Sequence, residues 1–236
     1  MWIEKDLDLF VDISTMCNAG CPVCHRTKPG TTETAEWLRE FTWSIEDVKN
    51  SYKKDFLKKY VAQAQICGTW GDPFMVKDIS QIIDYFLEDT TLKILLNTNG
   101  SLRDEQFWWE LGVQSRNTGR IRVVFDIDGI DQEMHSLYRQ KTSLNKILNN
   151  MDAYVEGGGK AQTFTVVFKH NEKYLKQIEQ LCKKHGSTYH MTVLNERWYE
   201  FKGKNLWKFI DNEGKTQQLD KYVKYQKVWT AKPIWK

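Results

Sequence analysis

Strand-like and helix-like segments alternate along this chain of 236 residues, and the alternation constrains its fold more than any other feature. Short apolar, β-branched runs predict strands at Leu9–Ile13, Ala62–Cys67, Leu92–Asn97, Ile121–Ile127, Thr163–Phe168 and Tyr189–Leu194. Amphipathic patterns predict helices at Ser44–Tyr60, Ile79–Leu87, Arg103–Leu111, Glu133–Tyr154 and Lys173–His185. Repeated strand–helix units imply a parallel sheet, so we expect an α/β fold that curls into a partial, TIM-like (β/α)6 barrel.

Polar residues at the helix ends indicate where several helices begin and stop. Ser44 and Asp78 are candidate N-caps of the first two helices, and Gly186 is expected to end the last one. The triplet Gly157–Gly159 follows a helix, so it predicts a C-terminal turn and not a phosphate-binding loop. No linker divides the chain, so we expect one core over residues 1–193 with a C-terminal extension over residues 194–236.

Composition excludes several functional classes. The formal net charge is +3, with both signs spread along the chain, so nucleic acid is not an expected partner. No apolar run approaches the roughly 18–20 residues of a membrane span, and the charged first residues do not resemble a signal peptide. Five cysteines without a targeting segment favour a reducing cytoplasm.

Three of the cysteines, Cys17, Cys21 and Cys24, follow the first predicted strand and form a CxxxCxxC pattern. Three thiolates on one short loop can hold a metal centre and leave it one ligand short. On the loop alone two interpretations stay open, because thiolates suit an iron–sulfur cluster and zinc, and His25 could complete a structural Cys3His zinc site. Cys67 and Cys182 are isolated, and we expect both to be small buried hydrophobes.

Polar and glycine-rich segments follow the predicted strands, and in a barrel these positions share one rim, where the chemistry takes place. The cysteine loop follows the first strand. The next strand ends at Gly68–Pro73, the third at Asn97–Gly100, the fourth at Asp126–Gly129 and the fifth at Lys169–Asn171. Each segment alone is an ordinary turn signal, but four of them behind a cysteine loop predict a site.

Cysteine spacing, strand-then-loop context and polar strand ends together resemble the radical S-adenosylmethionine (radical SAM) enzymes, over about residues 8–193. In that family three cysteines hold a 4Fe–4S cluster whose open iron chelates the amino and carboxylate groups of SAM. The reduced cluster cleaves the sulfonium to a 5′-deoxyadenosyl radical, which abstracts hydrogen from a substrate. The resemblance implies the same two cofactors here, with Cys17, Cys21 and Cys24 as cluster ligands.

The resemblance also implies which residues contact SAM. The Gly68–Pro73 segment resembles the family's GGE element, in which Asp72 stands where the acid receives the SAM ammonium. Arg139 resembles the arginine that grips the SAM carboxylate, a task that suits its planar fork. The expected set is Gly68, Gly71, Asp72, Asn97, Asn99, Asp126 and Arg139. The alternatives are an exposed helix charge for Arg139 and a turn role for the two asparagines.

Three departures from the family pattern limit what carries over. Val23 precedes the third cysteine, where relatives often have an aromatic residue, and the GGE acid is the aspartate of an Asp72-Pro73 pair. That form resembles SPASM/twitch-type radical SAM proteins, but residues 194–236 contain none of their auxiliary-cluster cysteines. We therefore expect a single cluster, and the substrate stays open between a peptide or protein side chain and a small metabolite such as a nucleotide. The chemistry also implies an electron donor such as flavodoxin or ferredoxin.

The C-terminal extension is rich in tryptophan, tyrosine and lysine, from Arg197-Trp198-Tyr199 to Trp235. Interleaved basic and aromatic residues can form a nucleic-acid strip. They also suit a lid over the barrel mouth that shields a radical from water. The modest charge of the whole chain favours the lid.

Overall fold

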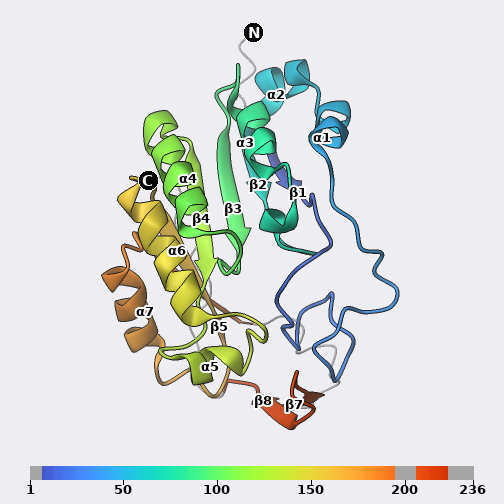
Figure 1. Ribbon diagram of the computed structural model, residues 1–236, viewed down its shortest axis with the longest axis vertical. Helices are drawn as coiled ribbons and strands as arrows, with labels where there is room; N and C mark the ends of the chain where they lie inside the picture. The colour runs from blue at the N-terminus through green and yellow to red at the C-terminus, as the bar shows by residue number, and fades with distance from the viewer. Residues whose placement is uncertain (1–6, 195–205, 223–236) are drawn as a thin grey trace.

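A six-stranded parallel sheet forms the centre of the computed structural model, which describes residues 7–194 and 206–222 (Figure 1). The strands are β1 (Leu7–Val11), β2 (Val61–Ile66), β3 (Lys93–Thr98), β4 (Ile121–Asp126), β5 (Ala161–Val167) and β6 (His190–Leu194). They lie side by side in chain order, and every neighbouring pair is parallel. The α/β class and the partial TIM-like barrel predicted from the alternation are confirmed.

Helices connect the successive strands and pack on the sheet. They are α1 (Ile45–Ser51), α2 (Lys54–Tyr60), α3 (Ile79–Leu87), α4 (Glu105–Thr118), α5 (Gln132–Ser136), α6 (Leu144–Glu156) and α7 (Leu175–Lys184), with a 3-10 turn η1 (Pro73–Met75). Branched and aromatic side chains from both layers form the main core, among them Ile66, Leu96, Phe125 and Trp108. This burial provides most of the driving force for folding.

Two predicted helices are each divided in two by the structure. Ser44–Tyr60 breaks at Tyr52, and Glu133–Tyr154 breaks between Ser136 and Leu144. Ser143 starts the second part of the latter, because its hydroxyl accepts a hydrogen bond from the Lys146 amide. Ser44 is an N-cap, as predicted. Asp78 occupies the N-cap position of α3, as predicted, but its carboxylate accepts from the Ile45 amide and not from the first turn of α3.

The helix α4 continues past the predicted end at Leu111 and packs closely on α6. A Cβ on Gly112 would lie 2.2 Å from the Tyr154 carbonyl oxygen, and one on Gly157 would lie 2.3 Å from the Trp109 oxygen. Glycine at these two positions therefore lets the two backbones meet. Gly157–Gly159 forms the C-terminal turn of α6, as predicted, with Gly158 at a φ of +96°.

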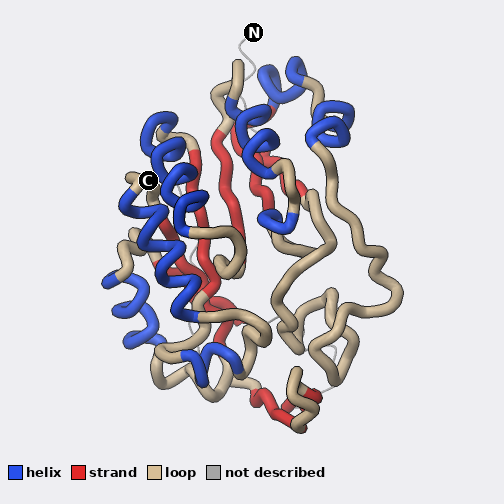
Figure 2. Tube along the Cα trace, viewed as in Figure 1, coloured by secondary structure: helices blue, strands red, loops and turns tan. Residues whose placement is uncertain are grey.

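The carboxyl ends of the strands point to one end of the molecule, where the long connections collect (Figure 2). The longest connection, residues 12–44, carries the three cysteines between β1 and α1. Because the sheet is parallel, the segments that follow β2, β3 and β4 reach the same end. The fold thus brings together the polar strand ends noted in the sequence.

An antiparallel hairpin, β7 (Leu206–Ile210) and β8 (Thr216–Asp220), lies beside this end of the sheet (Figure 1). Its buried side chains Trp207, Phe209 and Leu219 form a second apolar cluster with Cys21 and Val23 of the cysteine loop. The extension was expected as an aromatic lid, and the hairpin itself was not predicted. Of that lid, residues 195–205 and 223–236 lie outside the described residues.

Within the described ranges, none of the helices combines the length and apolar character that a membrane crossing requires.

Candidate cofactor site

One cavity of about 480 Å³, counting the space at its open mouth, lies where the strand ends meet the cysteine loop. Its lining consists of Cys17, Ala19, Cys21, Cys24, Arg26, Gly68, Gly71, Asp72, Asn97, Thr98, Asn99, Asp126 and Arg139. All ten site residues predicted from the sequence are among them. Ala19, Arg26 and Thr98 were not predicted. Thr98 lies between two predicted asparagines, whereas nothing in the local sequence shows that a loop arginine such as Arg26 is buried.

Backbone hydrogen bonds shape the cysteine loop. The Cys24 amide donates to the Cys21 carbonyl at 3.1 Å, and the Thr27 amide donates to the Cys24 carbonyl at 3.0 Å, so the last two cysteines lie on successive turns. The Gly20 amide donates to the Gln140 carbonyl at 3.0 Å, which fixes the loop to the segment after β4. The three cysteines line a cavity whose other lining residues lie mostly at or just beyond the ends of β2, β3 and β4.

The Gly68–Pro73 segment packs directly on the backbone that precedes the cysteines. A Cβ on Gly71 would lie 2.4 Å from the Ser14 carbonyl oxygen and 2.6 Å from that of Met16. The Asp72 amide donates to the same Met16 carbonyl at 2.8 Å. Glycine is thus required here for a contact between two protein backbones, and that contact brings Asp72 to the cavity wall.

The Asp72 carboxylate is a buried acceptor that links its own segment to the end of β3. Its Oδ2 accepts from the Thr98 hydroxyl at 2.9 Å, from the Asn99 amide at 2.9 Å and from Asn99 Nδ2 at 2.7 Å. Its Oδ1 accepts from the Phe74 amide at 3.0 Å. Burial raises the pKa of Asp72, and the hydrogen bonds from Asn99, Phe74 and Thr98 oppose that rise. The network fixes the end of β3 against the Gly68–Pro73 segment.

Asn99 also stabilises the turn after β3, so the turn role given above as an alternative for this residue is part of what it does. Its Oδ1 accepts from the Ser101 amide at 3.0 Å, and Gly100 has a φ of +74°. Its Nδ2 lies 3.7 Å from Cys17 Sγ. Asn97 is half-buried and accepts at Oδ1 from Gln65 Nε2 at 3.2 Å.

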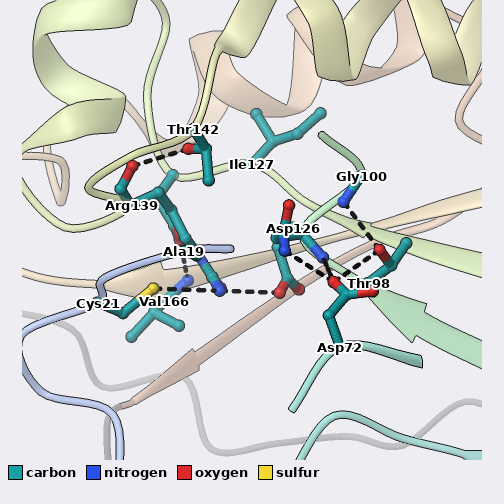
Figure 3. Close-up of polar contacts among 12 residues, drawn as sticks. Ala19, Cys21, Asp72, Thr98, Gly100, Asp126, Ile127, Arg139, Thr142 and Val166 are labelled. Carbon is teal, nitrogen blue, oxygen red and sulfur yellow. Dashed lines mark hydrogen bonds and ion pairs between the residues drawn. The ribbon is translucent and has the colours of Figure 1, made fainter. Parts of the chain in front are cut away.

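Arg139 lies between Cys21 of the cysteine loop and Asp126 (Figure 3), and it also forms an ion pair with Asp128. Its Nη1 lies 2.9 Å from Asp126 Oδ2 and 3.9 Å from Cys21 Sγ, and its Nε lies 2.5 Å from Asp128 Oδ2. Asp128 is fully buried and also accepts from the Val166 amide at 2.6 Å. Since Arg139 is only 8% exposed, its alternative as an exposed helix charge is wrong.

Burial governs the protonation of these groups. It raises the pKa of Asp126 to about 7, an effect that Arg139 opposes and Asp128 reinforces. Burial alone would lower the pKa of Arg139, but Asp126 and Asp128 raise it well above its ordinary value. Burial also raises the pKa of the Cys17 thiol to about 12. Without a bound metal this thiol is therefore neutral at physiological pH, and metal binding would have to displace its proton.

The two remaining cysteines and His25 lie apart from the cavity lining. Cys182 is fully buried in α7, as expected, whereas Cys67 is only half-buried and lies 3.6 Å from Thr69 Oγ1. His25 is exposed, and its ring packs edge-on against Trp70 with 6.5 Å between centroids. Among the described residues, no three His, Cys, Asp or Glu side chains are arranged to hold a single metal ion.

Two curated proteins are similar to this chain in sequence. The GTP 3′,8-cyclase of Nautilia profundicola is 24% identical over 202 residues, which cover 83% of this chain and 59% of the cyclase. The GTP 3′,8-cyclase of Campylobacter curvus is 24% identical over 169 residues, which cover 68% of this chain and 47% of the cyclase. The chain thus spans about half the length of these relatives.

Solved structures share the fold at low sequence identity. Streptococcus suis SuiB bound to S-adenosylmethionine matches with a TM-score of 0.65 and 16% identity, over 80% of this chain and 41% of SuiB. The protein anSMEcpe with bound AdoMet matches with a TM-score of 0.62 and 16% identity, over 80% of this chain and 51% of that protein.

A family model matches most of the chain. The model, described as the radical SAM superfamily, covers residues 11–182, which include the cysteine loop and all the other cavity residues. The members of this superfamily are enzymes that use a 4Fe–4S cluster and S-adenosylmethionine. The expected family is therefore confirmed: the chain belongs to the radical SAM superfamily.

Proposed function

We propose that this protein reductively cleaves SAM and abstracts a hydrogen atom from a substrate. The observation that carries the proposal is that the ten residues assigned by the sequence all line one cavity. When bound, the cofactors supply the radical: one electron enters the cluster, the C5′–S bond of SAM breaks to give methionine and a 5′-deoxyadenosyl radical, and this radical takes hydrogen from the substrate. The residues described above hold and orient these groups.

The donor set of the cavity fits both cofactors. Three thiols lie on one wall and would ligate the cluster as thiolates, with the fourth position left to a non-protein ligand. Amide and guanidinium donors already lie within 4 Å of two of the sulfurs, from Asn99 to Cys17 and from Arg139 to Cys21. These donors would stabilise negative charge on the sulfurs once the thiols are deprotonated.

The opposite wall suits a zwitterion, which requires acceptors for its ammonium and a donor for its carboxylate. Asp72 Oδ1 accepts one hydrogen bond, from Phe74, so it retains capacity for another. Asp126 binds Arg139 through Oδ2, and within the described ranges its Oδ1 remains available for an ammonium or a ribose hydroxyl. Arg139 is held at its Nε and Nη1, so Nη2 is the donor that we assign to the SAM carboxylate.

The rival function, a structural zinc module of Cys17, Cys21, Cys24 and His25, fits less well. His25 packs on Trp70 and is not part of the cavity lining. A zinc site would also give no function to Asp72, Asp126 and Arg139 on the opposite wall of the cavity.

Substrate and reductant are proposed by class. The substrate is a peptide or protein side chain or a small metabolite, and the similarity to GTP cyclases favours a nucleotide. The electron donor is a flavodoxin or ferredoxin. Five free cysteines and this chemistry suit a reducing cytoplasm.

We propose that residues 194–236 form an extension that covers the barrel mouth. In its described part, the Ile210 amide donates to the Gly30 carbonyl of the cysteine loop at 3.0 Å. The Lys169 amide, just beyond β5, donates to the Asp220 carbonyl at 3.0 Å. The hairpin therefore contacts the segments that follow the first and the fifth of the six strands.

The first experiment is anaerobic reconstitution with iron and sulfide, followed by iron, sulfide and zinc analysis. Wild-type protein should be brown and bind about four irons. Replacing Cys17, Cys21 or Cys24 with alanine should abolish the cluster, whereas the matched controls Cys67→Ala and Cys182→Ala should keep it. With reductant and SAM, wild-type protein should release 5′-deoxyadenosine. A colourless preparation with stoichiometric zinc and no iron would contradict the proposal.

A further inference from the structure

Arg26 is a buried cation in the cofactor cavity, two residues after the last cysteine. It is 5% exposed and is one of the cavity-lining residues. Its Nε donates to the Trp70 carbonyl at 3.2 Å, and its Nη1 donates to the Ala19 carbonyl at 3.4 Å. Its Nη2 donates to the Thr15 carbonyl at 3.3 Å and to the Thr34 hydroxyl at 3.1 Å.

All of these partners are neutral, and in the described part of the chain no carboxylate lies within ion-pair distance of Arg26. Arg139, the other cavity arginine, has Asp126 and Asp128 as counter-charges. A buried charge without a counter-ion is unfavourable, so a negative charge that arrives beside Arg26 would supply the missing counter-charge.

Arg26 is also held in place more firmly than a surface arginine. Its three carbonyl partners hold it on different sides. Thr15 precedes the first cysteine, Ala19 lies between Cys17 and Cys21, and Trp70 belongs to the Gly68–Pro73 segment. The guanidinium therefore stays within the cysteine loop and does not swing out to solvent.

We propose that Arg26 is the built-in counter-charge of the iron–sulfur cluster and favours its reduction. A 4Fe–4S centre held by three thiolates is anionic, and one-electron reduction adds a further negative charge. A fixed cation nearby stabilises the reduced form more than the oxidised form, and net charge around a cluster is one of the properties that set its potential. This inference rests on the proposed function, because it requires a cluster on Cys17, Cys21 and Cys24.

The test is a redox titration of the reconstituted, SAM-free protein, followed by the EPR signal of the reduced cluster. In Arg26→Gln the midpoint should move to a more negative potential. At a fixed potential the ratio of reduced to oxidised cluster should fall roughly tenfold, which is about 59 mV for a one-electron couple. Arg26→Lys keeps the positive charge but loses the planar guanidinium group, so its midpoint potential should lie close to that of wild type.

Arg120→Gln is the matched control. Arg120 also donates to three carbonyl oxygens, those of Leu87, Thr90 and Leu92, but it lies at the opposite end of the sheet. Its substitution should cost stability without moving the midpoint.

The possible outcomes distinguish an electrostatic role of Arg26 from a purely structural role in the cysteine loop. Iron-loaded Arg26→Gln with a wild-type midpoint would overturn the proposal. Loss of iron in both Arg26 variants would also overturn it, since Arg26 would then act only as a loop scaffold. Loss of iron in Arg26→Gln alone, with a near-wild-type midpoint in Arg26→Lys, would support it. Wild-type protein that binds no iron would instead refute the proposed function.

Discussion

At the scale of single residues, the buried triad of Arg139, Asp126 and Asp128 gives one arginine two tasks. Its Nε and Nη1 hold two carboxylates, one of them with zero exposure, and the same Nη1 reaches Cys21. A residue expected only to bind a cofactor is thus also part of the fold. Effects of its substitution on cofactor affinity have to be measured beside effects on stability.

Replacing Arg139 with glutamine should lower the free energy of unfolding by about 3–5 kcal/mol, because it leaves two buried carboxylates without a cation. Adding Asp126→Asn to Arg139→Gln should restore part of the lost free energy of unfolding, since one of the two carboxylate charges is then removed. Urea unfolding of both single variants and the double variant forms a thermodynamic cycle. Additive effects would show that the two side chains do not interact.

The sequence identified the cavity residues that have chemically distinctive side chains at strand ends, such as Asp72 and Asn99. It did not identify Arg26, because the signal for a buried loop arginine is tertiary: its carbonyl partners are Thr15 and Ala19 of its own loop and Trp70, 44 residues further along the chain. Nor could the sequence show that Gly71 meets the backbone of Ser14 and Met16.

At the scale of elements, the break between α5 and α6 is fixed by a buried histidine. His135 Nδ1 accepts from the Asp128 amide at 3.2 Å, so its Nε2 carries the proton and donates to the Thr142 hydroxyl at 3.1 Å. That hydroxyl in turn donates to the Arg139 carbonyl at 2.7 Å. The network holds the turn that carries Arg139, and it requires a neutral imidazole.

This network predicts a specific acid sensitivity. Burial, reinforced by Arg139, lowers the pKa of His135 to about 3, whereas an unfolded histidine titrates near 6.5. Between these values the unfolded state binds more protons, so the contribution of His135 to stability is complete above pH 6.5 and is lost as the pH falls. The loss approaches about 1.4 kcal/mol per pH unit.

His135→Asn, whose Oδ1 can replace Nδ1 as acceptor, should be less stable than wild type at pH 7.5 but should lose less stability on going to pH 5. Chemical denaturation across this range measures the difference, with the exposed His25→Asn as control. Parallel pH profiles of wild type and His135→Asn would contradict the prediction.

Periodicity predicted every strand of the sheet, because β-branched runs bounded by turn signals are local features. Periodicity predicted a single helix where the structure has α5 and α6. The residues between them are compatible with a helix, and the His135 network that interrupts the helix is long-range. The hairpin had a local signal that was not used: the mostly apolar run Leu206–Ile210 is followed by Asp-Asn-Glu-Gly, which is typical of a turn.

At the scale of the whole molecule, the hairpin links the cysteine loop to the segment after β5 through its buried face. Trp207 and Phe209 pack with residues of the cysteine loop and with Phe168 beyond β5, whereas Ile210 on the same strand is 53% exposed. The stability of the cysteine loop should therefore depend on one face of β7.

Phe209→Ala should lower the free energy of unfolding by about 3–5 kcal/mol, because it removes a fully packed aromatic side chain. It should also speed the loss of iron from the reconstituted protein to a chelator, since the loop that holds the ligands loses its apolar support. Ile210→Ala, which keeps the backbone bond to Gly30, is the matched control and should change neither quantity appreciably. Equal rates of iron loss in the two variants would show that the hairpin does not support the loop.

The strand order has a consequence for how the protein is made. Because each strand pairs with the next one in the chain, the sheet can grow during synthesis as each strand leaves the ribosome. The cysteines emerge before the residues of the opposite cavity wall, and that wall is complete only when Arg139 and the segment that binds Gly20 have followed. The ligands therefore wait, as reduced thiols, through the synthesis of more than a hundred further residues. Cofactor loading therefore follows the synthesis of the cavity wall, although the cluster ligands are made well before it.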